Sequence, residues 1–206
     1  MKKNLCCFII LVININLIPP ILAQQNETGT FIDNRDNKSY KWVKIGTQVW
    51  MAENLNYNSG EGSWCYDDNE VNSSIYGRIY QYSIAMNVCP TGWHLPSRDE
   101  WMILVDFLGG KEDGGGKAKS ITGWASPNVG ATNESGFSAL PGGYRIDRLN
   151  KYLEMGEAGS WWVSPKTSDS FPMTFKLYSN YKSFSWSWEG QLSALCSSYI
   201  RCIRDT

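Results

Sequence analysis

Histidine and cysteine side chains carry much of the nucleophilic and metal chemistry of proteins, and this chain has one histidine and six cysteines. Activation of a serine or cysteine nucleophile needs a base, nearly always a histidine, which makes His94 the one candidate. Because His94 stands between Trp93 and Leu95-Pro96, before an expected helix, we expect a buried structural residue that hydrogen-bonds the backbone. A single imidazole cannot build a zinc site without thiolates, so no metal site is expected.

Paired carboxylates are a second source of catalysis, because glycosidases hold two of them about 5–9 Å apart. The candidates are Asp67, Asp68, Asp99, Glu100 and Glu134. Asp99 and Glu100 are explained by a helix cap, and adjacency in sequence does not show that any two carboxylates face each other. We therefore expect no catalytic residue, no enzymatic activity and no cofactor.

Aromatic side chains are the remaining candidates for a binding site. Phe184, Trp186 and Trp188 alternate with serines, so a strand places all three rings on one face. If that face meets solvent, the rings are suited to stacking on pyranose rings; the alternative is that the face belongs to the core. Trp161 and Trp162 are adjacent, so in a strand one ring points each way, and Trp162 joins Trp186 and Trp188 as a candidate ligand-binding residue.

The composition excludes several classes of protein. The 206 residues are 42% hydrophobic and 14% aromatic, which is enough apolar surface for a folded core and argues against disorder. The chain is rich in Gly, Ser, Asn and Trp, unlike a coiled coil. Its formal net charge of −1, without a run of Lys or Arg, argues against nucleic-acid binding.

Residues 1–23 have the layout of a secretory signal peptide. Lys2 and Lys3 precede a mostly apolar stretch from 5 to 18, and Ala23 offers a cleavage site. The stretch is too short for a membrane span of roughly 20 residues, although a retained N-terminal anchor helix is the alternative. We expect a mature chain that begins at Gln24, carries no transmembrane anchor, and is secreted or held at the cell surface.

Four cysteines remain after removal of this leader: Cys65, Cys89, Cys196 and Cys202. An even number in an exported chain predicts two disulfides rather than a metal site or a redox pair. Three pairings are open. Cys196 and Cys202 lie about 20 Å apart in an extended strand, beyond the ~7 Å Cα limit for a bridge, unless a tight hairpin intervenes.

The sequence predicts one α+β domain, with two short helices followed by antiparallel strands and long loops. Residues 24–39 are polar and are interpreted as a linker or a loose first strand, and residues 40–206 as the domain. The expected elements are a hairpin around Gly46-Thr47, a helix over 79–88, and a helix that begins with the capping box of Ser97 and Glu100 and ends at Gly109-Gly110. Residues 111–116 are expected to form a mobile surface loop, followed by strands at 160–163, 173–178, 183–188 and 199–203.

Six motifs stand in a fixed order along the chain. They are Trp50-Met51-Ala52-Glu53-Asn54-Leu55, Tyr76-Gly77-Arg78, Cys89-Pro90-Thr91-Gly92-Trp93-His94-Leu95-Pro96-Ser97, Gly136-Phe137-Ser138-Ala139-Leu140-Pro141-Gly142-Gly143-Tyr144-Arg145, Trp161-Trp162 and Arg201-Cys202-Ile203-Arg204-Asp205. Together they resemble the Fibrobacter succinogenes major paralogous domain, a family of exported bacterial proteins. The resemblance implies an exported, often cell-surface domain.

A weaker resemblance points to the C-type lectin-like fold, shared with formylglycine-generating enzymes. It implies that Cys89, at the end of a helix, bonds Cys202 in the last strand, which leaves Cys65 and Cys196 for each other. Many members of the family carry a second cysteine eight positions after the one matching Cys65, where this chain has Ser73. The tripeptides that bind calcium in many such lectins are absent, and Asn133-Glu134 and Asp67-Asp68 are the remaining oxygen donors, so calcium binding stays open.

We therefore expect a secreted or cell-surface, non-catalytic recognition domain. The expected partner is an extracellular glycan or a surface protein, with glycans as the leading class. The alternatives are a degenerate formylglycine-generating-type enzyme and an inert adhesion or display subunit.

Overall fold

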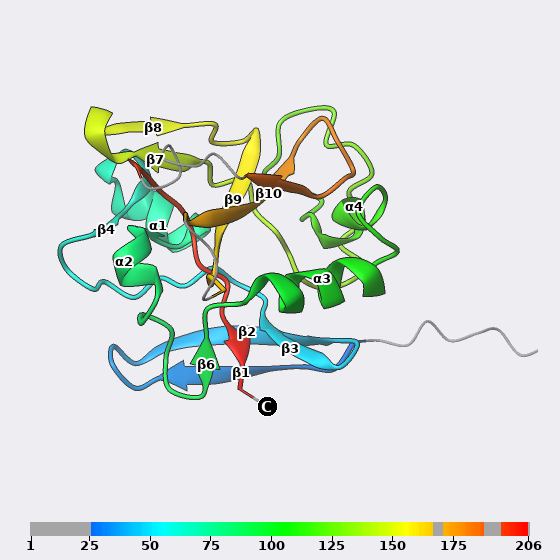
Figure 1. The fold of residues 1–206 in the computed structure, drawn as a ribbon, viewed down its shortest axis with the longest axis horizontal. Coiled ribbons are helices and arrows are strands. Elements are labelled where there is room, and N and C mark those ends of the chain that lie inside the picture. Colours follow the sequence, from blue (N-terminus) through cyan, green and yellow to red (C-terminus); the bar gives the residue numbers. More distant parts are fainter. Residues whose placement is uncertain (1–25, 167–170, 188–194, 206) are drawn as a thin grey trace, which may run out of the picture.

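The computed structural model describes residues 26–166, 171–187 and 195–205 (Figure 1). The leader at 1–23 and the candidate Trp188 lie outside these residues. The fold is mixed α+β, as predicted, and two of its helices have seven or more residues. The helices are α1 (Glu70–Tyr76), α2 (Tyr82–Ala85), α3 (Arg98–Phe107) and α4 (Gly114–Ala118), with 3₁₀ turns at Tyr66–Asp68 and Asp147–Leu149.

The largest sheet is five-stranded, antiparallel and curled, in the order β1-β2-β3-β13-β6. Its strands are β1 (Thr28–Asp33), β2 (Lys38–Ile45), β3 (Gln48–Met51), β13 (Ile203–Arg204) and β6 (Trp93–His94). Residues 28–33, within the segment interpreted as a linker or a loose first strand, form a paired strand. The ring of Phe31 holds β1 in place, because it stacks on Tyr40 and Trp93 at centroid distances of 5.6 and 4.5 Å.

The predicted hairpin around Gly46-Thr47 is confirmed, with Ile45 paired to Gln48. Both faces of β2 are covered. Val43 and Ile45 face a core that lies under α3, whereas Tyr40 belongs to a second core on the opposite face of the sheet.

The helix predicted from the capping box is confirmed as α3. The backbone amide of Glu100 donates to Ser97 Oγ, and the Ser97 amide donates to Glu100 Oε2 at 2.7 Å. Trp101 on the inner face of α3 stacks on Phe175 at 4.1 Å, so the helix joins the five-stranded sheet to the strands of the second half of the chain.

Three smaller antiparallel sheets complete the fold. In the first, β10 (Met173–Tyr178) lies between β9 (Ala158–Val163) and β11 (Ser185–Ser187). In the second, β7 (Tyr144–Ile146) lies between β8 (Lys151–Leu153) and β12 (Cys196–Ser197), and the third pairs β4 (Ser63–Trp64) with β5 (Ile79–Tyr80). Trp161 and Trp162 on β9 do belong to different clusters, but each cluster is a core. Both side chains are fully buried, so the expectation that one ring lies at the surface was wrong.

Two local predictions were wrong because contacts between residues far apart in the sequence override the local sequence preference. The helix expected over 79–88 is only four residues long, because the Tyr80 amide donates to Ser198 O and Ile79–Tyr80 pairs with β4. The expected mobile loop at 111–116 instead contributes Gly114, Gly115 and Gly116 to the buried helix α4. A Cβ at Gly115 or Gly116 would collide with the carbonyl oxygens of Lys182 and Gly130, so only glycine fits there.

Candidate functional site

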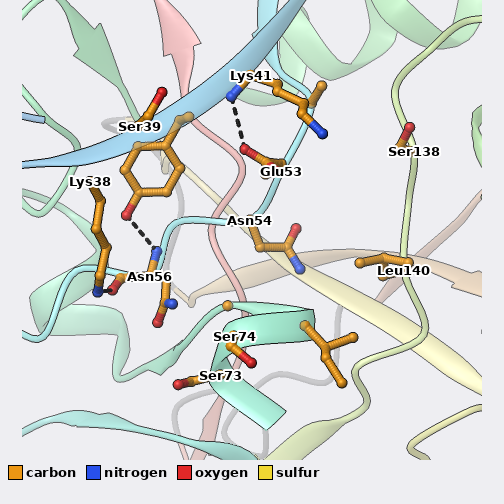
Figure 2. A pocket seen from close by; sticks show the side chains of 14 residues that line it. Lys38, Ser39, Lys41, Glu53, Asn54, Asn56, Ser73, Ser74, Ser138 and Leu140 are labelled. Atoms are coloured by element: carbon orange, nitrogen blue, oxygen red, sulfur yellow. Dashed lines mark hydrogen bonds between the residues drawn. The ribbon is translucent and has the colours of Figure 1, made fainter. Parts of the chain in front are cut away.

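A pocket of about 370 Å³ opens between β2, residues 52–56, the C-terminal half of α1, and residues 138–140 (Figure 2). We call it the α1 pocket. It is lined by Lys38, Ser39, Tyr40, Lys41, Ala52, Glu53, Asn54, Asn56, Ser73, Ser74, Ile75, Gly77, Ser138 and Leu140. Its volume lies in the range of small-molecule sites in proteins.

Asn54 forms the base of the α1 pocket and is held by three hydrogen bonds. Its Oδ1 accepts from Trp161 Nε1 at 2.8 Å and from Arg201 Nε at 3.0 Å, and its Nδ2 donates to Tyr76 O at 2.7 Å. Gly77 follows α1 with φ of 80° and packs so closely that a Cβ would lie 2.8 Å from the Asn54 Cβ. The end of α1 is therefore fixed against Asn54, and the pocket is preformed.

Arg201 lies directly behind the pocket and is fully buried. Besides Asn54, its guanidinium donates to the carbonyl oxygens of Met51, Phe137 and Ser138, and it sits 4.6 Å from the Phe137 ring. Burial lowers its pKa to about 9, with Glu53 as the nearby carboxylate that opposes this shift. A cation is thus held beneath Asn54 and Ser138.

The side of the α1 pocket nearest β2 is polar. Lys38 Nζ donates to Asn56 O, and the Asn56 amide donates to Tyr40 Oη at 3.0 Å. The amide of Lys41 donates to Glu53 Oε2 at 2.8 Å. The side-chain oxygen of Asn56 is buried and has no hydrogen-bond partner within the described residues.

The opposite side of the α1 pocket is partly apolar. Ile75 on α1 is 54% exposed, and Leu140 faces the opening from the 138–140 loop. Ser74 lies beside Ile75 on the exposed side of the helix. The pocket therefore combines amide and hydroxyl side chains with aliphatic ones, a lining suited to a ligand with hydroxyl groups and a C–H face.

The aromatic residues predicted as a sugar platform lie elsewhere. Trp162 is fully buried and donates from Nε1 to Tyr80 O at 2.7 Å, so it cannot contact a ligand, and that prediction was wrong. Trp186 on β11 is half-buried, with its ring packed edge-on against Phe175 at 4.8 Å. The structure does not bring Trp186 and Trp162 together, and neither lines the α1 pocket.

His94 was predicted to be buried and bonded to backbone, and both expectations were wrong. Because Trp93 takes the inward position of β6, the neighbouring side chain of His94 points outward and is 41% exposed. Its Nδ1 lies 2.6 Å from Asp205 Oδ1 and its Nε2 2.8 Å from Glu100 Oε1. Burial lowers the pKa of His94, but the two carboxylates outweigh that effect, so the pKa is raised above 6.5.

Ser97 lies on the far side of Glu100 from this imidazole. The Ser97 hydroxyl donates to Glu100 Oε2, so the carboxylate separates the hydroxyl from His94. Activation of a serine needs the opposite order, with histidine between the hydroxyl and the carboxylate. Ser97 and Glu100 therefore form a helix cap, and the Glu100 carboxylate of this cluster also binds the His94 imidazole.

One predicted disulfide is confirmed and the other is not formed. Cys89 is bonded to Cys202, across a sequence separation of 113 residues. Cys65 and Cys196 are not joined. The Cys65 thiol hydrogen-bonds with the side chains of Ser73 and Glu70 on α1, whereas Cys196 lies on β12 opposite Ile146, so the two cysteines belong to different surroundings.

A comparison with models of protein families shows to which family this chain belongs. The model of the Fibrobacter succinogenes major domain matches residues 43–204. The chain belongs to this family. No curated protein and no solved structure matches it. The disulfide of this Fibrobacter succinogenes major domain is typical of oxidising, extracellular environments.

The described part of the chain contains neither a membrane-spanning helix nor a cluster of metal-binding side chains. No helix there has the length and apolar character needed to cross a membrane. No cluster of three or more His, Cys, Asp or Glu residues there is arranged to hold a metal ion.

The α1 pocket was missed by sequence reasoning, although its residues lie within quoted motifs. Ala52, Glu53 and Asn54 belong to the first motif, Gly77 to the second, and Ser138 and Leu140 to the fourth. These motifs lie far apart in sequence, so their meeting depends on the tertiary fold. The signal available in the sequence was the concentration of Asn, Ser and Gly in motifs that no catalytic pattern explains.

Proposed function

We propose that this Fibrobacter succinogenes major domain is a secreted or cell-surface, non-catalytic recognition domain that binds a saccharide in the α1 pocket. The observation that carries the proposal is the lining of the pocket. The polar residues Asn54, Asn56, Ser74 and Ser138 line the same pocket as the aliphatic residues Ile75 and Leu140. Such a lining matches the alternating O–H and C–H surfaces of a pyranose ring.

The order of elements supports a C-type lectin-like arrangement. Helix α2 is followed by Cys89, then β6, then the capped helix α3, and Cys89 is bonded to Cys202 beside the terminal strand β13. That arrangement is the one implied by the lectin-like resemblance. In this proposal the α1 pocket replaces the aromatic face of β11 as the saccharide site.

Two observations support a non-catalytic role. Glu100 separates the Ser97 hydroxyl from His94, which does not favour nucleophilic catalysis. Cys89 and Cys202 are bonded to each other, whereas the formylglycine-generating alternative needs a reduced cysteine pair. An assay of thiol-peptide oxidation with the purified domain tests that alternative, and turnover would contradict the proposal.

A glycan array tests saccharide binding directly. The variants should be Ser74→Trp, which places an indole in the α1 pocket, and Val71→Trp, which places one on the same helix at a position 63% exposed and outside the pocket. We expect the wild type and Val71→Trp to bind the same saccharides and Ser74→Trp to bind none. Absence of binding by the wild type favours the inert adhesion subunit, and equal binding by all three proteins places the site elsewhere.

A further inference from the structure

We infer that the α1 pocket selects saccharides that carry a carboxylate, such as uronic acids. This inference rests on the proposed saccharide binding and names the class of sugar. It follows from the charged side chains around the pocket, because some of them already form ion pairs and others do not.

Two ion pairs lie near the pocket, and each is neutral in itself. Lys38 Nζ lies 3.3 Å from Asp36 Oδ2 on the turn before β2. Arg78, which follows the pocket residue Gly77, contacts Glu70 Oε1 at 2.6 Å. Because the charges within each pair cancel, the pairs contribute little net field at the opening.

Three further charges remain, and two of them are positive. Arg201 and Lys41 form no ion pair within residues 26–166, 171–187 and 195–205, and Glu53 is the one carboxylate among the residues that line the pocket. The Oε2 atom of Glu53 accepts a hydrogen bond from the backbone amide of Lys41 at 2.8 Å. The balance at the pocket is therefore one positive charge, before any ligand enters.

The position of Arg201 makes this positive charge effective. Its guanidinium is fully buried, and among the described residues it is bonded only to neutral oxygens, those of Asn54 and three carbonyl groups. Water does not screen a buried charge as it screens a surface one, and the guanidinium is bonded to Asn54 and Ser138, which both line the pocket. An anionic group in the pocket would compensate a cation that has Glu53 nearby but no carboxylate bonded directly to it.

Lys41 supplies the exposed part of the site. Figure 2 shows Lys41, Asn54, Ser138 and Leu140 arranged around the same opening, with the Lys41 side chain on the side of β2. A sugar ring lying against Leu140 would bring a ring carboxylate within reach of this flexible ammonium group. Lys41 thus acts as a direct contact, whereas Arg201 acts through the field of its charge.

Matched pairs of oligosaccharides provide the test. Oligomers of galacturonate, glucuronate, mannuronate and guluronate are printed beside their carboxyl-reduced counterparts, which keep the ring and lose the charge. We expect wild-type binding to the acidic member of a pair only, weakening as ionic strength rises. Replacement Lys41→Gln should lower the affinity about tenfold, the scale of one charge contact, whereas Lys44→Gln on the same strand, outside the pocket, should leave it unchanged.

The outcomes separate the inference from the proposed function. Equal binding of acidic and reduced members, or binding confined to reduced or other neutral sugars, overturns the charge selectivity while saccharide binding stands. Failure of the wild type to bind any saccharide overturns both. Acid-selective binding that Lys41→Gln and Ser74→Trp leave unchanged places the site away from the α1 pocket and also overturns the inference.

Discussion

The Oδ1 atom of Asn54 accepts a hydrogen bond from Arg201 Nε at 3.0 Å, although the two residues are 147 positions apart in sequence. The contact connects the base of the α1 pocket to the terminal segment of the chain. The same oxygen accepts from Trp161 Nε1, so one amide satisfies two buried donors. Removal of this acceptor therefore affects both the core and the shape of the pocket.

The replacement Asn54→Leu should lower the free energy of unfolding by about 3–5 kcal/mol, because it leaves a buried indole N–H and a buried guanidinium N–H without an acceptor. Urea unfolding measures the change. The matched replacement Asn87→Leu, at an exposed turn position, should stay within about 0.5 kcal/mol. A loss below about 1 kcal/mol for Asn54→Leu would show that water or another group satisfies both donors.

His94 provides a pH-dependent contribution to stability. Its folded pKa is raised above 6.5, so its stabilisation is complete below pH 6.5 and is lost as the pH rises through the folded value. The pKa of Glu100 is lowered, so its contribution is present above about 4.5 and is lost as the pH falls through its folded value. The cluster stabilises the fold most between these two limits.

The His94 imidazole is the single histidine probe in the chain, so its NMR titration is unambiguous. We expect a midpoint above 6.5 in the wild type and a downward shift in Asp205→Asn. In His94→Gln the decrease of stability above pH 6.5 should disappear. A midpoint at or below 6.5 would show that burial outweighs the carboxylates and would contradict this account.

Ser73 occupies the place from which a second cysteine would reach Cys65. The Cys65 thiol already hydrogen-bonds with the Ser73 side chain, so in Ser73→Cys the introduced thiol should form a disulfide with Cys65 on oxidation. The closed loop is short and should stabilise the fold by about 2–3 kcal/mol in the chain-entropy model. Peptide mapping without reduction detects the link. The control is Ser74→Cys, one residue along on the exposed side of α1, which should form no link. Absence of a linked peptide in Ser73→Cys as well would contradict the observed side-chain contact.

Trp162 and Trp186 should differ strongly in their effect on stability. Trp162→Ala should cost about 3–5 kcal/mol, because the side chain is fully buried and its N–H is bonded to Tyr80 O. Trp186→Ala should cost roughly 1–2 kcal/mol, since only part of that ring contacts the core. Thermal and urea unfolding of both variants measure the difference. Equal costs would show that Trp186 belongs to the core as fully as Trp162 does.

The parts of the fold that local sequence controls were predicted well. The capping box of Ser97 and Glu100 located the start of α3, and the Gly46-Thr47 turn located the hairpin of β2 and β3. Both features depend on residues a few positions apart. The Cys89–Cys202 bond was implied by the family order of elements rather than by spacing.

The parts that depend on distant contacts were not predictable from one sequence. Periodicity indicates that Trp161 and Trp162 point in opposite directions, but it does not show that a core covers each side of β9. A run of glycines resembles a loop until its neighbours are known, and here Gly115 lies in a buried helix whose backbone packs closely against the carbonyl oxygen of Lys182. The α1 pocket exists only because residues from four distant segments meet around Asn54.

The central claim is that the α1 pocket is the saccharide site, and amide chemical-shift mapping tests it most directly. A ¹⁵N-labelled domain is titrated with the tightest saccharide found on the array. The account predicts that the largest shifts fall on residues 38–41, 52–56, 73–77 and 138–140, the segments that line the pocket. Shifts concentrated on residues 173–187, which include β10 and β11, would contradict the account and would indicate that saccharides bind the aromatic face around Trp186.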